Sequence, residues 1–283
     1  MSLAALLGAG GLCIPGCWDG LSALMVERSG FGAAFLTGGG LSMARLGRAD
    51  MGLVTAPELV DAVERICDRV AIPLVVDADT GFGGTLNLQH ALRRIERAGA
   101  AAVVIEDQQF PKRCGHMAGK QVVPMTEAVG RIRAAVDAKG RMLLVARTDA
   151  LAIEGVDAAC DRAGALLDAG ADALFIEGPS SMEEARTIAR AFPETPLIHN
   201  LVEGGTTPST RSADFFALGF AATLHPLLLM HVLAAAGPEA LAVLKRDGST
   251  DALSGRIATL QDMNRLTGAQ DMIEQDARYA PDA

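Results

Sequence analysis

Short apolar runs alternate with longer amphipathic stretches along most of the chain. Eight runs have the length and apolar character of buried strands, at 12–17, 33–36, 74–77, 102–106, 142–146, 173–177, 197–199 and 221–224. Stretches with apolar residues at helical spacing lie between them, at 56–70, 85–98, 125–138, 156–169 and 181–191. Glycine or proline commonly separates a helix from the next strand. This alternation predicts parallel strands that are joined by helices.

Two α/β architectures fit such a pattern: a closed (β/α)₈ TIM-type barrel and an open doubly wound sheet. The first strand is not followed by a GxGxxG motif, and the chain has no Walker loop. The repeating units are even, at about 25–40 residues, and their sum matches the usual barrel length of about 250 residues. We therefore expect a barrel domain over 1–226. Residues 227–283 would form a C-terminal helical extension, with helical runs at 227–236, 238–245 and 252–266.

Composition and charge narrow the classes of function. The chain has 283 residues, of which 50% are hydrophobic, and its mean hydropathy is +0.27. A sizeable core is therefore expected and disorder is not. The net charge of −9 comes without clusters of basic residues, which argues against nucleic-acid and anionic-membrane partners. A small anionic substrate remains possible, because a few arginines in a cleft can reverse the local sign of the charge.

The cysteines and the apolar segments bear on cellular location. The five cysteines are odd in number and lack the spacing of a disulfide framework, so a reducing, cytoplasmic compartment is expected. Cys67 and Cys160 lie in apolar helical contexts that favour buried, inert thiols. Residues 1–11 lack the positive region of a signal peptide. The apolar tract at 221–236 is interrupted by polar residues, and we expect it to fall short of a membrane span.

Polar side chains follow the predicted strands at the point where each one ends. In a barrel, these positions would all surround one mouth, which is where barrel enzymes keep their chemistry. The alternative is that they cap the following helices, which suits a single Asp or Thr better than the whole set. The set comprises Trp18, Asp19, Thr37, Asp77, Asp79, Glu106, Asp107, Arg147, Asp149, Glu177, Asn200 and His225.

The acidic members of this set predict a cation site. Asp77 and Asp79 are two residues apart, so on an extended strand they would point the same way. With Glu106 on the adjacent strand they would repel one another, and a divalent cation would relieve that repulsion. Oxygen ligands with room for water suit Mg²⁺, with Mn²⁺ as a substitute.

Residues 112–116 read Lys-Arg-Cys-Gly-His and predict an active-site lid. Neighbouring cations lower the pKa of a thiol, and Gly115 and Gly119 would let the segment bend and close. Cys114 is therefore a candidate proton donor. A zinc site on Cys114 and His116 would lack its remaining ligands. A Cys–His hydrolase would lack an identifiable third partner and would not need the carboxylates. His116 could also be a loop residue without a role.

Together these motifs resemble the lyase branch of the isocitrate lyase/phosphoenolpyruvate mutase superfamily, which includes methylisocitrate lyase and 2,3-dimethylmalate lyase. The resemblance covers about 12–226. It rests on the sequences at 35–39, 46–55, 77–83, 106–108, 112–116, 147–149 and 200–208. The Lys-Arg-Cys-Gly-His run after Glu-Asp-Gln is its most specific part, because the mutase branch has other residues, asparagine among them, in the place of the cysteine.

The resemblance implies a Mg²⁺-dependent barrel with a gating loop at about 110–122. It also implies a homotetramer in which neighbouring subunits exchange their last helices, which would give 227–283 a purpose. The substrate would be a small 2-hydroxy di- or tricarboxylate. Val202 stands where lyases of tricarboxylates commonly have a hydroxyl residue, and Glu203-Gly204-Gly205 is more like the petal-death and dimethylmalate group. Both features favour a dicarboxylate such as 2,3-dimethylmalate over 2-methylisocitrate.

The implied reaction cleaves the C2–C3 bond of the substrate to give pyruvate or a related 2-keto acid and the enolate of a carboxylic acid, which Cys114 protonates. The expected metal shell is Asp79, Asp77, Glu106 and Asp50. The expected catalytic residues are Cys114, Lys112, Arg113, His116 and Glu177. The expected substrate-binding residues are Phe35, Thr37, Gly38, Gly39, Arg147 and Asn200. Phe35 and His225 both replace aromatic residues that are frequent in the family, and both could reshape the pocket.

Two other functions stay open. The same site could decarboxylate or hydrolyse oxaloacetate, or act on a phosphonopyruvate-type substrate. More remotely, the barrel could bind a keto acid without turnover, although a binding protein would not need a proton donor on a loop.

Overall fold

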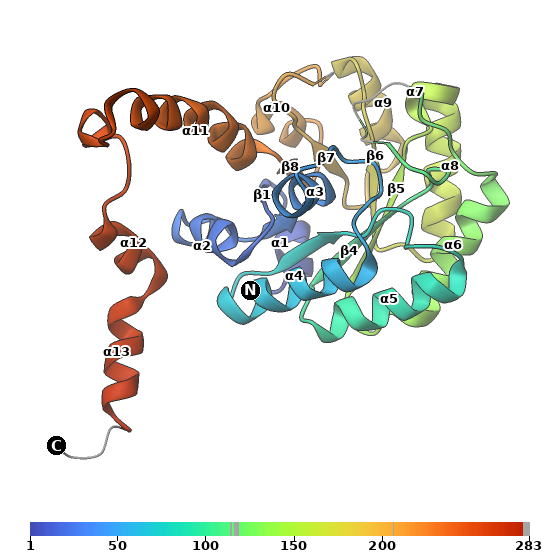
Figure 1. The fold of residues 1–283 in the computed structure, drawn as a ribbon. Coiled ribbons are helices and arrows are strands. Elements are labelled where there is room, and N and C mark those ends of the chain that lie inside the picture. The colour runs from blue at the N-terminus through green and yellow to red at the C-terminus, as the bar shows by residue number, and fades with distance from the viewer. Residues whose placement is uncertain (114, 116–118, 206, 280–283) are drawn as a thin grey trace. The chain divides into compact units, whose positions relative to one another are not determined.

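The computed structural model describes residues 1–113, 115, 119–205 and 207–279. Eight strands pair in parallel, in the order β6-β5-β4-β3-β2-β1-β8-β7 (Figure 1). They are β1 (Leu12–Cys17), β2 (Ala34–Leu36), β3 (Leu74–Asp77), β4 (Ala102–Glu106), β5 (Leu143–Thr148), β6 (Ala173–Ile176), β7 (Ile198–Asn200) and β8 (Ala222–His225). A parallel bridge between Leu174 and Leu197 joins β6 to β7 and nearly closes the ring. The predicted (β/α)₈ barrel is confirmed, and the open sheet is not formed.

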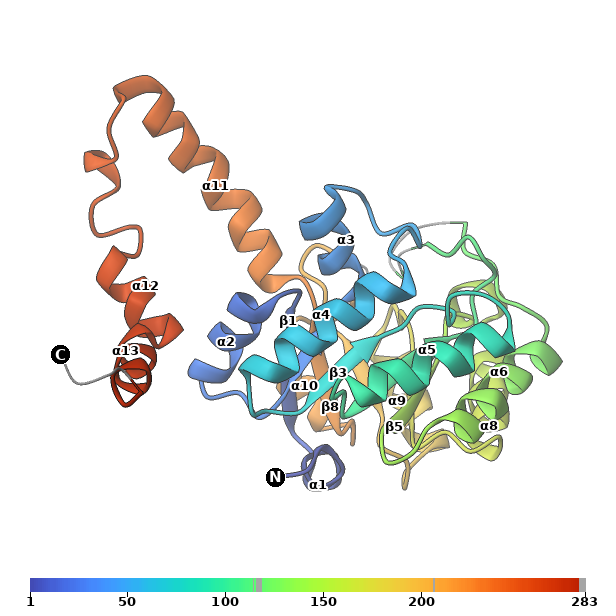
Figure 2. The ribbon, with the colours of Figure 1, turned by 60° about the horizontal axis from the view of Figure 1, so that its bottom comes forward.

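Helices surround the ring of strands (Figure 2). They are α1 (Leu3–Ala9), α2 (Gly20–Arg28), α3 (Gly38–Leu46), α4 (Ala56–Arg69), α5 (Thr85–Arg97), α6 (Met125–Ala138), α7 (Leu151–Glu154), α8 (Val156–Asp168), α9 (Met182–Ala191) and α10 (Ser212–Phe216). The strongly periodic ones were predicted from the sequence to within one or two residues. The short α1, α7 and α10 were not predicted, and neither were α2 and α3. Helix α3 begins with three glycines, which disfavour helix.

Alternate strand residues fill the barrel interior. Ile14, Phe35, Val104 and Phe175 belong to one buried cluster, and Leu7 of α1 packs against the same cluster. Burying a side chain of this size contributes roughly 1.5–3 kcal/mol. The packed interior leaves the polar residues at the C-terminal ends of the strands as the place for chemistry.

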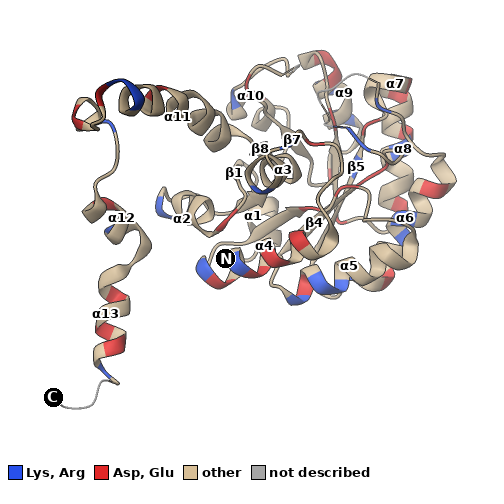
Figure 3. Cartoon of the chain, in the orientation of Figure 1, with Lys and Arg blue, Asp and Glu red and all other residues tan. Residues whose placement is uncertain are grey.

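Charges of both signs are interspersed along the outer helices of the barrel (Figure 3). For example, Asp61 on α4 pairs with Arg45 and Arg65 at 2.9 Å each.

The chain divides into two compact units, Met1–Leu228 and Leu229–Ala283. Beyond the barrel come α11 (Leu228–Asp247), a 3₁₀ turn (Asp251–Leu253), α12 (Leu260–Thr267) and α13 (Ala269–Ala277). The two helical runs expected at 227–236 and 238–245 form one helix, because Pro238 removes one backbone donor without ending it. The run expected at 252–266 is divided between the 3₁₀ turn and α12.

The length of α11 bears on the expectation that the apolar tract at 221–236 falls short of a membrane span. With 20 residues and a hydropathy of 1.4, this helix is long and apolar enough to cross a membrane by length and composition alone. A single helix of this kind is weak evidence for a membrane, because a helix that packs against another protein surface has the same character.

Candidate active site

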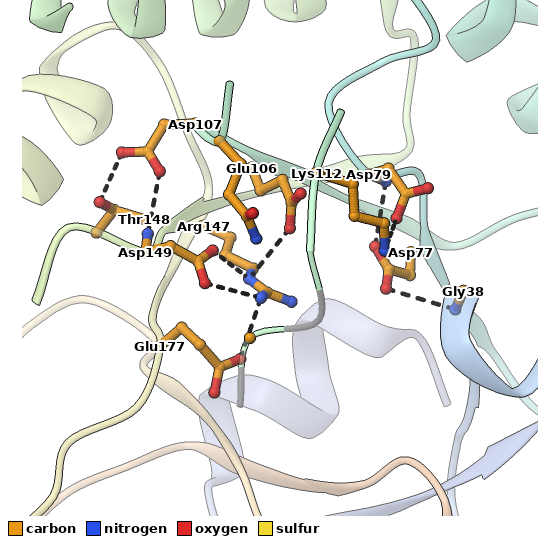
Figure 4. Close-up of polar contacts among 12 residues, drawn as sticks. Gly38, Asp77, Asp79, Glu106, Asp107, Lys112, Arg147, Thr148, Asp149 and Glu177 are labelled. Carbon is orange, nitrogen blue, oxygen red and sulfur yellow. Dashed lines mark hydrogen bonds and ion pairs between the residues drawn. The ribbon is translucent and has the colours of Figure 1, made fainter. Parts of the chain in front are cut away.

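Side chains from the C-terminal ends of neighbouring strands converge on one mouth of the barrel (Figure 4). Asp77 ends β3, Glu106 ends β4, and Arg147 lies directly opposite Glu106 in the β4–β5 register. Glu177 follows β6 and is fully buried, while Arg147 is 7% exposed. The strand-end pattern in the sequence therefore marked a real cluster, and the cluster is covered from solvent.

The carboxylates of this mouth enclose a lysine. The Lys112 ammonium lies 2.5 Å from Asp50 Oδ1 and 2.6 Å from Asp79 Oδ1. Lys112 is only 2% exposed, and burying a cation is tolerable when it is paired with anions. The Asp77 carboxylate accepts hydrogen bonds from the N–H groups of Asp79 at 3.2 Å and Gly38 at 3.4 Å. Lys112, which belongs to the segment predicted to gate the site, thus contributes a charge to the acid cluster itself.

The turn at Asp79 differs from the expected geometry. The sequence suggested that Asp77 and Asp79 project the same way from an extended strand. However, β3 ends at Asp77, and Asp79 adopts a left-handed backbone conformation with φ of 50°. This turn, rather than strand alternation, brings Asp79 to Lys112. Such a conformation is uncommon for a residue with a Cβ, and backbone conformations of this kind cluster at active sites.

Burial and repulsion keep two of the acids from ionising freely. Burial, together with the charges of Asp77 and Asp50, raises the pKa of Asp79 to about 7, although Lys112 opposes the shift. Burial also raises the pKa of Glu106 well above its usual value against the opposing effect of Arg147. Glu106 Oε2 lies 3.5 Å from Arg147 Nε, and Glu106 Oε1 has no hydrogen-bond partner among the described residues. Both carboxyl groups would gain from a bound cation.

Arg147 organises the other half of the mouth. Its Nε and Nη2 donate to the two oxygens of Asp149 at 2.9 and 3.1 Å, and Nη2 lies 3.5 Å from Glu177 Oε2. The guanidinium also lies 5.2 Å from the centre of the Phe175 ring. Burial opposes ionisation of Asp149, but Arg147 and Lys120 outweigh it and lower the pKa of that carboxyl. The Arg147 guanidinium is therefore held in place largely by Asp149 and Glu177.

Three residues outside the predicted site hold this cluster in place. Asp107 accepts hydrogen bonds from Thr148 Oγ1 at 2.6 Å and from the Asp149 N–H at 3.0 Å. Arg162 Nε lies 3.6 Å from Asp107 Oδ2, and Lys120 Nζ lies 2.9 Å from Asp149 Oδ1. Asp107 had a signal in the sequence as a strand-end acid. No sequence pattern pointed to Arg162 or Lys120, because their partners are distant along the chain.

The segment predicted to be a lid has a structured base. An antiparallel bridge joins Gln108 to Val122 at the two ends of the segment. The Gln108 side chain bonds the Arg113 backbone twice, donating to its carbonyl at 2.8 Å and accepting from its N–H at 3.0 Å. Lys120 Nζ donates to the Gly115 carbonyl at 2.5 Å. The Arg113 side chain is exposed.

Gly115 lies against the mouth itself. A Cβ built on Gly115 would lie 2.6 Å from Arg147 Nη2 and 2.8 Å from Glu177 Cδ. Only glycine allows so close an approach. Cys114 and His116, the predicted proton donor and its neighbour, lie outside the described residues.

The structure places the remaining predicted residues either at the mouth or in the barrel core. Thr37 caps α3 by accepting from the Gly40 N–H, and a Cβ on Gly39 would lie 3.6 Å from the Asp50 carboxylate. Asn200 Nδ2 donates to Glu177 Oε2 at 3.3 Å, so Asn200 borders the mouth. Phe35, by contrast, packs in the barrel core at 4% exposure.

A magnesium ion was predicted at the acid cluster. No three His, Cys, Asp or Glu side chains of the described residues are arranged to ligate a metal ion together. The donors nevertheless fit Mg²⁺, which in proteins takes one or two carboxylates and keeps several waters. Asp79 and Glu106 supply buried acid oxygens, and Glu106 Oε1 lacks a protein partner among the described residues.

Comparison with known protein families covers most of the chain. Residues 3–244 match the family described as phosphoenolpyruvate phosphomutase. The 2,3-dimethylmalate lyase of Eubacterium barkeri is 38% identical over 94% of this chain and 92% of its own length. The 2-methylisocitrate lyase of Bacillus subtilis (strain 168) is 40% identical over 84% of this chain and 78% of its own length.

Comparison with solved structures points to the same family. Oxaloacetate acetylhydrolase in complex with the inhibitor 3,3-difluorooxalacetate is 33% identical, with a TM-score of 0.94 over 100% of this chain and 97% of that one. Phosphonopyruvate hydrolase in complex with oxalate and Mg²⁺ is 28% identical, with a TM-score of 0.88 over 99% of each chain. Thus the family and the fold agree across the whole barrel.

Proposed function

Because the chain belongs to the phosphoenolpyruvate mutase/isocitrate lyase superfamily and is a lyase of it, we propose that it cleaves a 2-hydroxy di- or tricarboxylate. The products are pyruvate or a related 2-keto acid and a carboxylic acid. The observation that carries this proposal is the buried cluster in which Arg147 contacts Glu106 and Glu177 beneath the Gly115 segment.

The reaction needs a place for negative charge. The 2-hydroxyl of the substrate gives its proton to a basic group of the mouth, the C2–C3 bond breaks, and its electrons form an enolate on the departing carboxylic acid. Arg147, together with Thr37, Gly38 and Gly39 at the start of α3, would bind the carboxylate of the keto acid. A covered site strengthens each of these interactions because water is excluded.

Protonation of the enolate carbon is assigned to Cys114. The thiol gives its proton to carbon and regains one after the products leave, so the step balances without an oxidant or a cofactor. Lys112, Arg113 and His116 would tune the acidity of the thiol and carry its proton. Glu177 and Asn200, 3.3 Å apart, would orient His116 and the second carboxylate of the substrate.

We propose Mg²⁺ as the cofactor, held by Asp79, Asp77, Glu106 and Asp50, with Mn²⁺ as a substitute. When bound, the ion supplies Lewis acidity that lowers the cost of the oxyanion on the keto-acid half. The buried acid oxygens and the unpartnered Glu106 Oε1 support this assignment.

Among substrates, a dicarboxylate such as 2,3-dimethylmalate is favoured over 2-methylisocitrate. Val202 has no hydroxyl with which to bind a third carboxylate. The high similarity to oxaloacetate acetylhydrolase keeps one second candidate, hydrolytic cleavage of oxaloacetate at the same mouth. The substrate panel described below also tests cleavage of phosphonopyruvate and decarboxylation of oxaloacetate.

For assembly, we propose a homotetramer in which the C-terminal helices are exchanged between subunits. Exposed apolar side chains on these helices, which a monomer would leave in water, support it: Val232, Leu233, Leu241, Leu260, Met272 and Ile273. Light scattering of the purified protein measures the mass of the assembly, which should be four times that of one chain. A cytoplasmic location agrees with the free Cys13, Cys17, Cys67 and Cys160.

A substrate panel tests the function directly. The enzyme is incubated with Mg²⁺ and 2,3-dimethylmalate, 2-methylisocitrate, oxaloacetate or phosphonopyruvate, and pyruvate release is coupled to lactate dehydrogenase. Mass spectrometry identifies the second product. We expect pyruvate and a carboxylic acid from the 2-hydroxy acids. Release of oxalate and acetate from oxaloacetate, without turnover of any 2-hydroxy acid, would replace the lyase by the hydrolase.

A further inference from the structure

A second group of reactive side chains lies on the outside of the barrel, between β1 and β8. Leu12 and Ile14 point into the buried core, so Cys13 between them points outward. Cys13 pairs with Thr223 in the β1–β8 register, and His225 is two residues farther along β8, on the same face as Thr223. The group is therefore separated from the catalytic mouth by the wall of strands, and His225, which the sequence pattern placed at the mouth, points away from it.

The polar contacts in this group converge on the thiol. Ser212 Oγ accepts from Thr223 Oγ1 at 2.8 Å, lies 3.1 Å from His225 Nε2 and donates to Cys13 Sγ at 3.9 Å. Ser212 Oγ thus bridges Cys13 Sγ and His225 Nε2. On the far side of the ring, His225 Nδ1 lies 3.6 Å from Glu203 Oε1.

This arrangement orders a thiol, a hydroxyl, an imidazole and a carboxylate in series. A carboxylate behind an imidazole stabilises the imidazolium, which in turn stabilises a thiolate in front of it. The titratable groups that face the thiol and the imidazole from β1, β8 and the segment after β7 are Cys13, His225 and Glu203. The charges in the series therefore alternate in sign.

The other described cysteines have the opposite environment. Cys17 is fully buried, and burial raises the pKa of its thiol far above the usual range. Burial also raises the pKa of Cys67, to about 11, and that of Cys160. Burial acts on half-buried Cys13 in the same sense, but the hydrogen bond and charge of His225 outweigh it and lower the pKa of that thiol.

We propose that Cys13 is a modification site, a thiolate paired with His225 that reacts with small hydroperoxides and electrophiles. The sulfur attacks one peroxide oxygen, the O–O bond breaks, and Cys13 is oxidised by two electrons to the sulfenic acid. The leaving hydroxide takes a proton from the His225 imidazolium and departs as water. With hydrogen peroxide, the thiolate and imidazolium give sulfenic acid, neutral imidazole and one water, so atoms and charge balance.

Alkylation of the intact enzyme with iodoacetamide tests the pair. Samples are quenched over time at pH 6 to 9, and each cysteine is followed by peptide mass spectrometry. Fragmentation assigns the label within the peptide that carries both Cys13 and Cys17. We expect Cys13 to react at least tenfold faster than Cys67 and Cys160 at pH 7, with a rate that levels off at lower pH than theirs. Slower reaction of Cys13 than of those two thiols would overturn the proposal.

Two variants separate pairing from exposure. His225→Asn removes the imidazolium, and we expect the Cys13 rate at pH 7 to fall at least tenfold while the Cys67 rate stays unchanged. Glu203→Gln keeps the imidazole and should give a smaller loss. An unchanged Cys13 rate in His225→Asn would refute the pairing. If that variant does not fold, the pH profile of Cys13 in the natural chain decides. Dimedone labelling after hydrogen peroxide treatment should modify Cys13, and labelling elsewhere only would exclude it as an oxidation site.

Discussion

Gly115 lies so close to Arg147 that a Cβ on the glycine would come within 2.6 Å of Nη2. The Arg147 guanidinium cannot easily move away, because it donates two hydrogen bonds to Asp149. The approach links the gating segment to the strand-end charges. It also explains why the segment needs a glycine beside Cys114.

The substitution Gly115→Ala should therefore impair catalysis without unfolding the enzyme. The added methyl group displaces the segment from Arg147, and we expect kcat/KM to fall about 10- to 100-fold, since small misplacements of reacting groups cost about that much. Gly130→Ala on α6 is the matched control, because a Cβ there meets nothing within 4 Å and alanine favours the helix. Steady-state kinetics and thermal melting compare the two. Equal kinetics for both variants would argue against a closed segment during turnover.

Lys112 should be essential for turnover. Lys112→Met leaves Asp50 and Asp79 without the ammonium that neutralises them, and we expect kcat/KM to fall at least about 100-fold, as for loss of other charge-stabilising groups. Lys139→Met removes a lysine that pairs with Asp172 at 2.8 Å at the opposite end of the barrel. This control should keep its activity in the coupled pyruvate assay. Activity of Lys112→Met near that of the control would exclude a role for the ammonium.

The pKa of Asp149 predicts how stability depends on pH. Because Arg147 and Lys120 lower this pKa against the effect of burial, Asp149 stabilises the fold above its unfolded-state pKa of about 3.9. That stabilisation is lost as the pH falls through the folded-state pKa. We expect Asp149→Asn to cost about 3–5 kcal/mol at pH 7, where it takes a carboxylate away from two buried cations, Arg147 and Lys120.

The difference between Asp149→Asn and the natural chain should shrink below about pH 4, where the aspartate begins to lose its charge. Urea unfolding midpoints at pH 7 and pH 3.5 measure it. Asp61→Asn, at an exposed ion pair, serves as the control and should change little at either pH. A difference that is constant with pH would show that charge at Asp149 does not account for the loss.

Cys114 should be required for product formation. Cys114→Ala removes the proposed proton donor, and general acids of this kind contribute about 100- to 10,000-fold. Cys114→Ser keeps the size of the side chain but raises the pKa of the donor, so it should also be slow. Cys160→Ala changes a thiol on α8 and should keep full activity. Turnover of both Cys114 variants near that of the natural chain would refute the acid role.

A chelator should abolish activity, and added Mg²⁺ or Mn²⁺ should restore it. Binding can be measured without turnover, because an ion that binds only the folded state at 100 times its Kd stabilises it by about 2.7 kcal/mol. We expect Mg²⁺ to raise the melting temperature of the metal-free protein and Asp79→Asn to reduce that rise. Full activity in metal-free buffer would remove the ion from the proposed mechanism.

Much of this molecule follows from local sequence. Strand and helix periods of 2 and 3.6 residues are local properties, so the barrel and its principal helices could be predicted within a residue or two. Parallel strands all end at the same mouth, and for this reason the polar residues at 77, 106, 147 and 177 could be placed together before any coordinates were known. Cys114 and His116 were found as a motif, and their position in the mouth stays a prediction.

Only the tertiary structure decided which charges meet. Sequence could not show that Lys112 pairs with Asp50, that Lys120 reaches Asp149, or that Asp79 turns through a left-handed conformation. Nor could it show that Cys13 and His225, more than two hundred residues apart, are bridged by Ser212 Oγ when β1 and β8 join. Secondary structure depends on neighbours in the chain, whereas pairing of charges and the resulting pKa values depend on distances and burial that arise only when the barrel closes.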